Sequence, residues 1–516
     1  MTRLRKHWGW GFEDQQPAPE EVEAAAAGAR LHLGFAPTQV ERAVPLEEVE
    51  LPEPRLAPPA SLASICVTNT RERVTHAYGK SYRDVIRAFR GRVDNPPDVV
   101  AHPNDEADVE RVLGWCEEVG AAAIPYGGGT SVVGGVEPPG ERPAVTIDLG
   151  RLDRVLEVDT VSRAARIQAG ATGPGLEAQL REHGLTLRHF PQSFEYSTLG
   201  GWIATRAGGH YATLHTHIDD FVESVRALTP RGLWESRRLP GSGAGPSPDR
   251  LLIGSEGTLG VITEAWMRVQ DVPSFRESAA VAFDGFEAGA EAVRALSQSG
   301  LHPSNCRLLD GAEAELTGAS PDGRALLVLG FESADHELGP WMARALELCG
   351  DHGGQPRDRS GAEGSWRDAF LQAPYLRDTL VAAGIFVETF ETAVTWDRFG
   401  ELVAGVRARI REALGADAAL TCRLTHVYPD GAAPYFTVLT PARRGDELAQ
   451  WDEVKAAASE AILAGGGTIT HHHAVGRDHR PWYDRQRPEP FAEALRSAKA
   501  AVDPAGILNP GVLVDP

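Results

Sequence analysis

The sequence predicts an α+β fold with at least two domains, and three observations lead to that prediction. The chain has 516 residues, which is too long for a single hydrophobic core. Short strands and amphipathic helices are mixed in the first half without strict alternation. After Pro273 the pattern changes to longer helices separated by strands, which predicts an antiparallel sheet with helices on one face.

The first half shows its elements in order. Residues 98–102 predict a strand, and Asn104 can cap a helix that carries Asp105 and Glu106 in its first turn. Apolar side chains then recur at helical spacing until Gly120, which ends the helix. Further strands are expected at 121–125, 144–149, 155–159 and 165–168, with a helix at 175–182.

The second half continues with helices and strands of a different domain. Helices are expected at 286–297, 341–349 and 396–414, and strands at 325–331 and 435–439. The amphipathic tail at 491–502 is expected to pack back onto the first domain. We therefore divide the chain into an N-terminal segment with a proline-rich linker, two domains and a C-terminal helical segment, at 1–92, 93–273, 274–480 and 481–516.

Composition and charge exclude several classes of protein. The net charge of −21 argues against nucleic acid as a partner, because phosphate binding needs concentrated Lys and Arg. No stretch reaches the roughly 18 apolar residues of a transmembrane helix, and the N-terminus has no secretory signal. Five widely spaced cysteines predict neither a disulfide framework nor a zinc knuckle, and fit a reducing, cytoplasmic location.

A glycine-rich loop follows the predicted strand at 121–125. Three successive glycines allow backbone amides to approach an anion closely and to form a concave nest. The glycine spacing fits neither a dinucleotide-binding fingerprint of the Rossmann type nor a Walker motif. Taken alone, the loop is equally consistent with a flexible surface turn. Its residues are Pro125, Tyr126, Gly127, Gly128, Gly129, Thr130 and Ser131.

Three further small-residue loops follow in the same domain. A tight turn would explain each of them singly, but not all four in this order. The second loop comprises Gln192, Ser193, Phe194, Glu195, Tyr196, Ser197 and Thr198. The third comprises Thr205, Arg206, Ala207 and Gly208, and the fourth comprises Glu256, Gly257, Thr258, Leu259, Gly260, Val261 and Ile262.

The four loops together resemble the FAD-binding domain of the vanillyl-alcohol-oxidase type, also called the PCMH type. The resemblance covers about residues 93–273 and implies a two-lobed FAD-binding domain plus a cap domain. It also implies that all four loops bind FAD. Some relatives attach flavin through a histidine in the first loop, whereas this loop has Thr130 and Ser131 there, so the resemblance implies non-covalent FAD.

The most unusual string in the cap is a triple histidine, His471, His472 and His473. On an extended backbone, His471 and His473 would share one face. Paired imidazoles can bind metal, transfer protons or contact an anion, and a partly exposed polar strand is the plainer interpretation. No metal site is expected, because no nearby cysteine or carboxylate completes a ligand set.

In this context the histidines are similar to those of the alkyldihydroxyacetonephosphate synthase family. An N-terminal Trp-Gly-Trp-Gly string at 8–11 matches that family as well. The resemblance implies substrate-binding roles for Arg307 and Arg377 and a catalytic role for Tyr435 and the three histidines, with Tyr428 as a second candidate tyrosine. Departures from the family pattern are Ala474 and Arg477, where glycine and lysine are usual.

The resemblance implies that the acyl group of acyl-dihydroxyacetone phosphate is exchanged for a fatty alcohol, without net redox change, in ether lipid biosynthesis. It also implies a homodimer, with peripheral contact to membranes. A flavin-linked D-2-hydroxyacid dehydrogenase of the D-lactate type is the alternative. Its metal-binding histidine motif is altered here, with Val427 and Pro434 at the two histidine positions and His426 out of register by one. An inactive flavin-binding scaffold is the non-enzymatic alternative.

Overall fold

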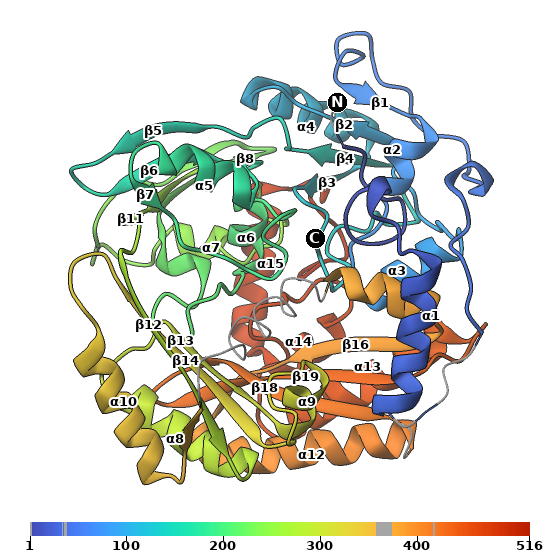
Figure 1. Ribbon diagram of the computed structural model, residues 1–516. Coiled ribbons are helices and arrows are strands. Elements are labelled where there is room, and N and C mark those ends of the chain that lie inside the picture. Colours follow the sequence, from blue (N-terminus) through green and yellow to red (C-terminus); the bar gives the residue numbers. More distant parts are fainter. Residues whose placement is uncertain (1–2, 34, 36–38, 358–373, 416–417, 516) are drawn as a thin grey trace.

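A computed structural model describes residues 3–33, 35, 39–357, 374–415 and 418–515. Its elements form two halves (Figure 1). One half carries three small sheets, and the other is built on one large sheet. The last helix, α15, runs back from the large-sheet half toward the small sheets. Sequence patterns therefore predicted the α+β class correctly.

The first half contains a four-stranded sheet and a five-stranded sheet. In the former the strand order is β1-β2-β4-β3, and both β2 and β3 are parallel to β4. The latter is antiparallel, in the order β5-β6-β10-β8-β9, and β11 pairs with β7 beside it. The strands are β1 (Cys66–Val67), β2 (Val99–Ala101), β3 (Ala122–Tyr126), β4 (Ala144–Asp148), β5 (Val155–Asp159), β6 (Ala164–Gln168), β7 (Leu185–Thr186), β8 (Val222–Thr229), β9 (Gly232–Glu235), β10 (Val261–Arg268) and β11 (Gln270–Asp271).

Helices of the first half begin and end where local chemistry predicts. In α4, the Asp105 side chain accepts the N–H of Asp108, and Gly120 ends the helix at a φ of 66°. The expected capping residue was wrong by one position, because Asn104 donates to the Asp108 carboxylate instead. The helices are α1 (Pro19–Gly28), α2 (Thr70–Thr75), α3 (Tyr82–Phe89), α4 (Glu106–Val119), α5 (Gly173–Arg181), α6 (Leu199–Thr205) and α7 (Asp249–Leu252).

The cap half is built on one antiparallel sheet in the order β15-β12-β14-β13-β18-β19-β16, with β17 paired to β19. Side chains alternate across it, and Phe386, Cys422 and Phe436 point into the helix-covered core. Its strands are β12 (Phe275–Phe283), β13 (Asn305–Leu309), β14 (Ala325–Ser333), β15 (Gln355–Arg357), β16 (Ile385–Glu391), β17 (Val394–Thr395), β18 (Ala419–Val427) and β19 (Gly431–Pro441). Its helices are α8 (Phe286–Gln298), α9 (Gly311–Leu316), α10 (Gly339–Asp351), α12 (Trp396–Leu414) and α13 (Glu447–Ala464).

After the cap, α14 (Arg480–Gln486) and α15 (Glu489–Val502) lead back to the first half. Leu495 and Leu508 belong to the core of the first half, and the N–H of Ala123 in β3 donates to the carbonyl of Ile507 at 2.8 Å. The C-terminal segment is therefore tied to the first half. Within the residues described, no helix has both the length and the apolar character needed to cross a membrane.

Candidate active site

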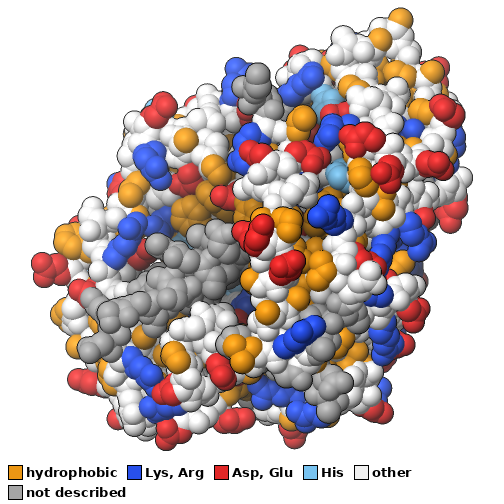
Figure 2. Space-filling view, turned by 45° about the vertical axis from the view of Figure 1, so that its right-hand side comes forward, with side chains coloured by type: hydrophobic (Ala, Val, Ile, Leu, Met, Phe, Trp, Pro, Cys, Tyr) orange, Lys and Arg blue, Asp and Glu red, His pale blue; other side chains and the backbone are white. Residues whose placement is uncertain are grey.

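A cavity of about 1130 Å³ lies between the two halves. That volume exceeds the range of roughly 300–1,000 Å³ that small-molecule sites usually span. Loops of the first half line one wall, and the open face of the cap sheet lines the other. Small residues of α1 line one flank of the cavity. In the view that brings the α1 side of the molecule forward, hydrophobic side chains surround a hollow in the surface (Figure 2).

The first wall presents backbone rather than side chains. The loop after β3 packs so closely on the second loop that a Cβ at Gly128 would lie 2.0 Å from the carbonyl oxygen of Tyr196. A Cβ at Gly127 would lie 2.2 Å from the Thr198 hydroxyl oxygen. Only glycine allows this approach, and it leaves main-chain groups facing the cavity.

Most residues predicted to bind the cofactor line this wall. The side chain of Glu256 is the one charged group among them. The lining members are Pro125, Tyr126, Gly127, Gly128, Gly129, Thr130, Ser131, Gln192, Ser193, Ser197, Thr198, Thr205, Ala207, Gly208, Glu256, Gly257, Gly260 and Ile262.

The other predicted residues of these loops lie outside the cavity lining. Arg206 ends α6 in a left-handed conformation and points to Asp219, 3.0 Å away. Thr258 is buried and donates to the Ser255 carbonyl. Leu259 and Val261 are in the hydrophobic core. The remaining three, Phe194, Glu195 and Tyr196, pack around the wall, where Phe194 stacks on Trp202 and Tyr196 hydrogen-bonds to Tyr375 at 2.6 Å.

Glu256 joins the two halves. Its carboxylate accepts the N–H of Val475 at 2.9 Å and that of Gly476 at 2.8 Å, just after the triple histidine. Burial raises the pKa of Glu256 to about 7, although both hydrogen bonds oppose the shift. A loop that the sequence associates with the cofactor thus also holds the turn that follows the histidines.

The second wall follows from strand alternation. Every second residue of 385–389 in β16, of 419–425 in β18 and of 435–439 in β19 faces the cavity, and the strand register pairs these residues in rungs. The first rung holds Arg423 and Tyr435, and Glu391 pairs with Tyr435 just outside the cavity lining. The second rung holds Thr421, Thr437 and Thr389, and the third holds Ala419, Leu439 and Val387. Polarity falls from one rung to the next, so the cavity has a charged end and an apolar end.

Tyr435 lies at the charged end, 5% exposed. The Arg423 guanidinium lies over its ring, 4.1 Å from the centroid, and Thr389 hydrogen-bonds to its hydroxyl. Burial raises the pKa of Tyr435, and Arg423 only partly opposes this. The phenol therefore keeps its proton at neutral pH. Tyr428 does not line the cavity and instead hydrogen-bonds to His471.

Three arginines line the charged end. Arg307 in β13 is buried, and burial together with the nearby Arg423 lowers its pKa to about 9. Arg423 in β18 also donates to Glu313 at 2.5 Å. Two neighbouring guanidinium groups on one face of the sheet favour binding of an anion between them, because a planar guanidinium group can donate two hydrogen bonds to one phosphate or carboxylate group.

Arg377, the third arginine, is held by the N-terminal segment. It lies in a helical segment at 374–382 and donates to the Lys80 carbonyl at 2.9 Å and to Thr389 at 3.3 Å. The adjacent Asp378 is buried, and its carboxylate accepts hydrogen bonds from Lys6 Nζ at 2.6 Å and from the N–H of Trp10 at 2.9 Å. A Cβ at Gly9 would lie 2.2 Å from that carboxylate, which explains the glycine between the two tryptophans.

The three histidines form a bend, not the extended strand considered from the sequence. The Glu391 carboxylate accepts the N–H groups of His471, His472 and His473 at 2.6–3.1 Å, so the chain curls around it. As a result, His472 and His473 both flank Tyr435, with ring centroids 6.1 and 5.4 Å away. They line the cavity, whereas His471 lies behind them.

The histidines at the cavity are neutral. Burial lowers the pKa of His473 well below its usual value, and Glu391 only partly restores it. Burial lowers the pKa of His472 as well. Neutral imidazoles carry a lone pair that can accept a proton, so this end of the cavity has a base beside a phenol.

The backbone wall fits a flavin dinucleotide. Successive amides after β3 suit a pyrophosphate, and no lysine, arginine or histidine of the first half lines the described cavity. Two family models match in the same order, FAD binding domain at 97–236 and FAD linked oxidases, C-terminal domain, at 272–513. The fold, the cavity and the two family models together identify a flavoprotein of the FAD-linked oxidase type, and FAD is its cofactor.

Similar proteins and solved structures narrow the class of flavoprotein further. The chain is 32% identical to alkyldihydroxyacetonephosphate synthase of Dictyostelium discoideum and to that of Trypanosoma brucei brucei, in alignments covering 86% of this chain and 77% of each relative. A solved structure of alkyldihydroxyacetonephosphate synthase matches with a TM-score of 0.83 at 27% identity and 98% coverage of both chains. The chain belongs to the alkyldihydroxyacetonephosphate synthase family. D-lactate dehydrogenase [cytochrome] of Arabidopsis thaliana is 26% identical, covering 89% of this chain and 81% of the relative.

Sequence reasoning missed several residues of the cavity. Arg423 and Thr389 were not among the predicted site residues, and Trp10 was noted only within the Trp-Gly-Trp-Gly string at 8–11. All three line the cavity. Strand alternation was the available signal for Arg423 and Thr389, but using it needs the register of β16, β18 and β19.

Proposed function

We propose that this protein exchanges the acyl group of acyl-dihydroxyacetone phosphate for a fatty alcohol and so forms an ether bond without net oxidation or reduction. Family membership supports the reaction class. The observation that carries the proposal for this chain is the gradient across the cap sheet, from Arg423 and Tyr435 to Leu439 within one cavity. A phosphate and a hydrocarbon chain are the two ends of this substrate.

The length of the gradient suits a lipid. Successive rungs on one face of a sheet are about 7 Å apart, so the first and third rungs are separated by about 14 Å. Beyond the third rung, Ile385 of β16 continues the apolar lining, and further apolar side chains of the lining come from other elements, which are Leu33, Leu316 and Leu380. An alkyl chain in this part would leave water, which favours binding in proportion to its buried area.

Arginine side chains provide the anion sites. We assign Arg307 and Arg423 to the phosphate, because they lie on neighbouring strands and face the same space. Arg377 reaches the cavity from the opposite side and is suited to the departing fatty-acid carboxylate. Guanidinium groups in a water-poor site bind such anions strongly.

Proton transfer at C1 is assigned to His473 and Tyr435. Since Tyr435 keeps its proton and His473 is neutral, the imidazole accepts the C1 proton and returns a proton to C1 after the exchange, while the phenol donates a hydrogen bond to an oxygen of the substrate. Thr389 fixes the phenol orientation and also contacts Arg377. FAD, held by the glycine-rich backbone wall, would supply a nucleophilic ring atom for the exchange of one oxygen substituent at C1 for the other.

A direct assay tests this proposal. Purified FAD-loaded protein is mixed anaerobically with palmitoyl-dihydroxyacetone phosphate and hexadecanol, without an electron acceptor, and products are measured by mass spectrometry. We expect stoichiometric release of palmitate and formation of the hexadecyl ether. Bleaching of the flavin by D-lactate, with no ether formed, would support the D-2-hydroxyacid dehydrogenase instead. If the FAD-loaded protein carries out neither reaction, the remaining hypothesis is the inactive flavin-binding scaffold.

We also propose that the protein is a cytoplasmic homodimer that contacts membranes peripherally. The family likeness implies the dimer, and the five free cysteines support a reducing, cytoplasmic location. Hydrophobic side chains around the hollow in Figure 2 support a surface that receives lipid substrates. Light scattering of the purified protein measures the oligomeric state, and sedimentation with phospholipid vesicles measures membrane contact. A monomer that stays in the supernatant would contradict both parts.

A further inference from the structure

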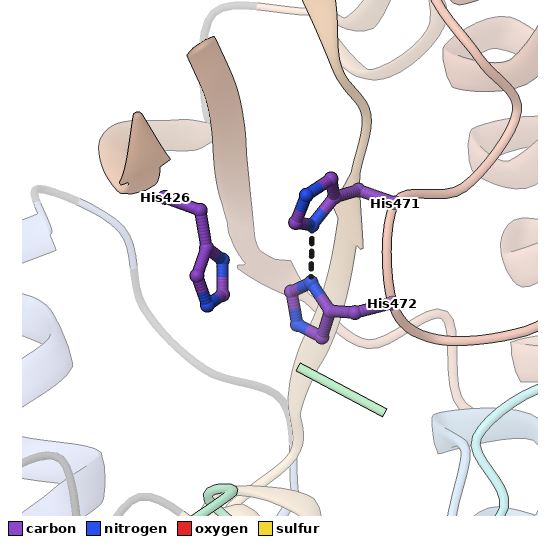
Figure 3. A group of neighbouring side chains, drawn as sticks. All are labelled: His426, His471 and His472. Atoms are coloured by element: carbon purple, nitrogen blue, oxygen red, sulfur yellow. Dashed lines mark hydrogen bonds between the residues drawn. The ribbon is translucent and has the colours of Figure 1, made fainter. Parts of the chain in front are cut away.

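A group of three histidines, His426, His471 and His472, lies beside the proposed catalytic residues His473 and Tyr435. His426, at the end of β18, faces His471 and His472 of the histidine loop (Figure 3). One ring nitrogen from each of the three lies within 4.8 Å of the others. The Nδ1 atoms of His471 and His472 are 3.1 Å apart. Residues about 45 positions apart in sequence thus form one compact group of nitrogens.

The tautomer of His426 is fixed by its surroundings. Its Nε2 lies 3.0 Å from the carbonyl oxygen of Gly209, and a carbonyl can only accept, so Nε2 carries the hydrogen. The Nδ1 atom therefore holds a lone pair. The residue is 2% exposed, this nitrogen has no hydrogen-bond partner, and the ring faces the other two histidines (Figure 3). A buried acceptor without a partner is costly unless something else binds it.

Two of the rings have outer partners typical of metal ligands. Tyr428 lies 2.6 Å from Nε2 of His471 and is itself 3.0 Å from the hydroxyl of Thr216. The Gly209 carbonyl has the same place at Nε2 of His426. Ligating imidazoles usually hold a carbonyl, hydroxyl or carboxylate on the nitrogen that does not face the metal.

We propose that His426, His471 and His472 bind one divalent first-row cation, with Zn²⁺ as the expected ion. Tetrahedral Zn²⁺ with Zn–N distances of about 2.0–2.1 Å separates its nitrogens by about 3.4 Å. The His471–His472 pair already has nearly that spacing. Three protein ligands leave the fourth position open, as in catalytic rather than structural sites.

The open position faces the cavity, because His426 and His472 also line it. Its ligand is a water or an oxygen of a phosphate-bearing or hydroxyl-bearing substrate. The proposal goes beyond the proposed function, which assigns no metal, and it leaves His473 and Tyr435 to handle the proton. No third ligand was apparent near 471–473 in the sequence, and the fold brings His426 there through β18.

Metal binding to the FAD-loaded full-length protein tests the site. The protein is first treated with a chelator and dialysed, and Zn²⁺ is then titrated by calorimetry, with metal content checked by mass spectrometry. We expect one equivalent to bind. The variants His426→Ala and His426→Gln should each weaken binding by more than about 100-fold, because loss of a ligand exceeds the 10–100-fold effect of outer partners.

His426→Gln keeps an amide donor for the Gly209 carbonyl and so guards against simple misfolding of the alanine variant. The exposed His183→Ala is the matched control and should bind as the wild type does. Tyr428→Phe should weaken Zn²⁺ binding by about tenfold. Absence of a stoichiometric ion in the wild type, or equal binding by both His426 variants that retain FAD, would overturn the proposal.

Discussion

The two walls of the cavity bind their ligands in different ways. On the first-half wall, glycines bring main-chain groups up to the cavity, and Glu256 is the one charged side chain of the predicted loops that lines it. On the cap wall, Arg307, Arg423 and Tyr435 project from strands of one sheet. A backbone wall can bind a cofactor whatever the side chains around it, whereas a side-chain wall can change with the substrate while the fold stays the same. The predictions below separate the two walls by experiment.

The largest effect is expected on the cap wall. His473→Ala and Tyr435→Phe should each lower kcat by about 10²–10⁴-fold, because proton transfer by a positioned group contributes that much. Both variants should keep their flavin spectrum, since neither residue belongs to the backbone wall. Steady-state assays and absorbance of the purified protein measure the two effects. Tyr78→Phe, a buried tyrosine that does not line the cavity, is the control. Wild-type turnover in both variants would refute the assigned roles.

On the backbone wall we expect the opposite pattern. Gly128→Ala should reduce FAD affinity by at least about tenfold, because its Cβ would lie 2.0 Å from a carbonyl oxygen and the two loops must separate. Fluorescence titration of the apoprotein with FAD measures the change. Gly114→Ala, in α4 with no atom within 4 Å of the new Cβ, should bind FAD as the wild type does. Equal affinity of the two variants would show that this close approach is not needed.

A smaller effect is expected where the N-terminal segment supports the cap wall. Lys6→Met leaves the buried Asp378 without its cation, so the helical segment that carries Arg377 loosens. We expect KM for the acylated substrate to rise about tenfold with kcat changed much less, which corresponds to about 1.4 kcal/mol. Arg3→Ala, from the exposed pair with Asp14, should leave KM unchanged. A fall in kcat alone would place Arg377 in the chemical step.

The smallest effect concerns the link between the walls. The pKa of Glu256 is raised to about 7, so the folded protein holds this proton above the pH at which the unfolded chain releases it. The resulting stability is fully present below about pH 4.5 and is lost as pH rises through 7. The melting temperature of the wild type should therefore fall relative to that of Glu256→Gln between pH 5 and pH 8. A constant difference across this range would mean that Glu256 titrates normally.

The backbone wall could be predicted from the sequence because its information is local. Glycine runs such as 127–129 mark close approach in any context, and 18 of the predicted loop residues line the cavity. The failures have local causes too. Val261 and Ile262 are neighbours on a strand, so only Ile262 can face the cavity, and Arg206 turns away because it ends α6 in a left-handed conformation.

The cap wall was harder to predict, because its residues meet through strand register and long-range contacts. Arg423 and Tyr435 are paired across β18 and β19, and nothing in either segment alone shows that pairing. The bend of the histidines depends on Glu391, 80 positions earlier, which no local pattern around 471–473 reveals. Resemblance to a family identified Tyr435 and Arg377, but not the reasons for their positions.

The carboxylate of Glu256 has a practical consequence for protein engineering. Because a side chain from the flavin half fixes the turn at 474–476, the two halves are not independent modules that can be exchanged freely. A chimaera that joins this cap to the flavin domain of a relative would need a matching acid at that place. Without it, the transplanted histidines would sit on an unanchored turn, and the hybrid would be yellow but inactive.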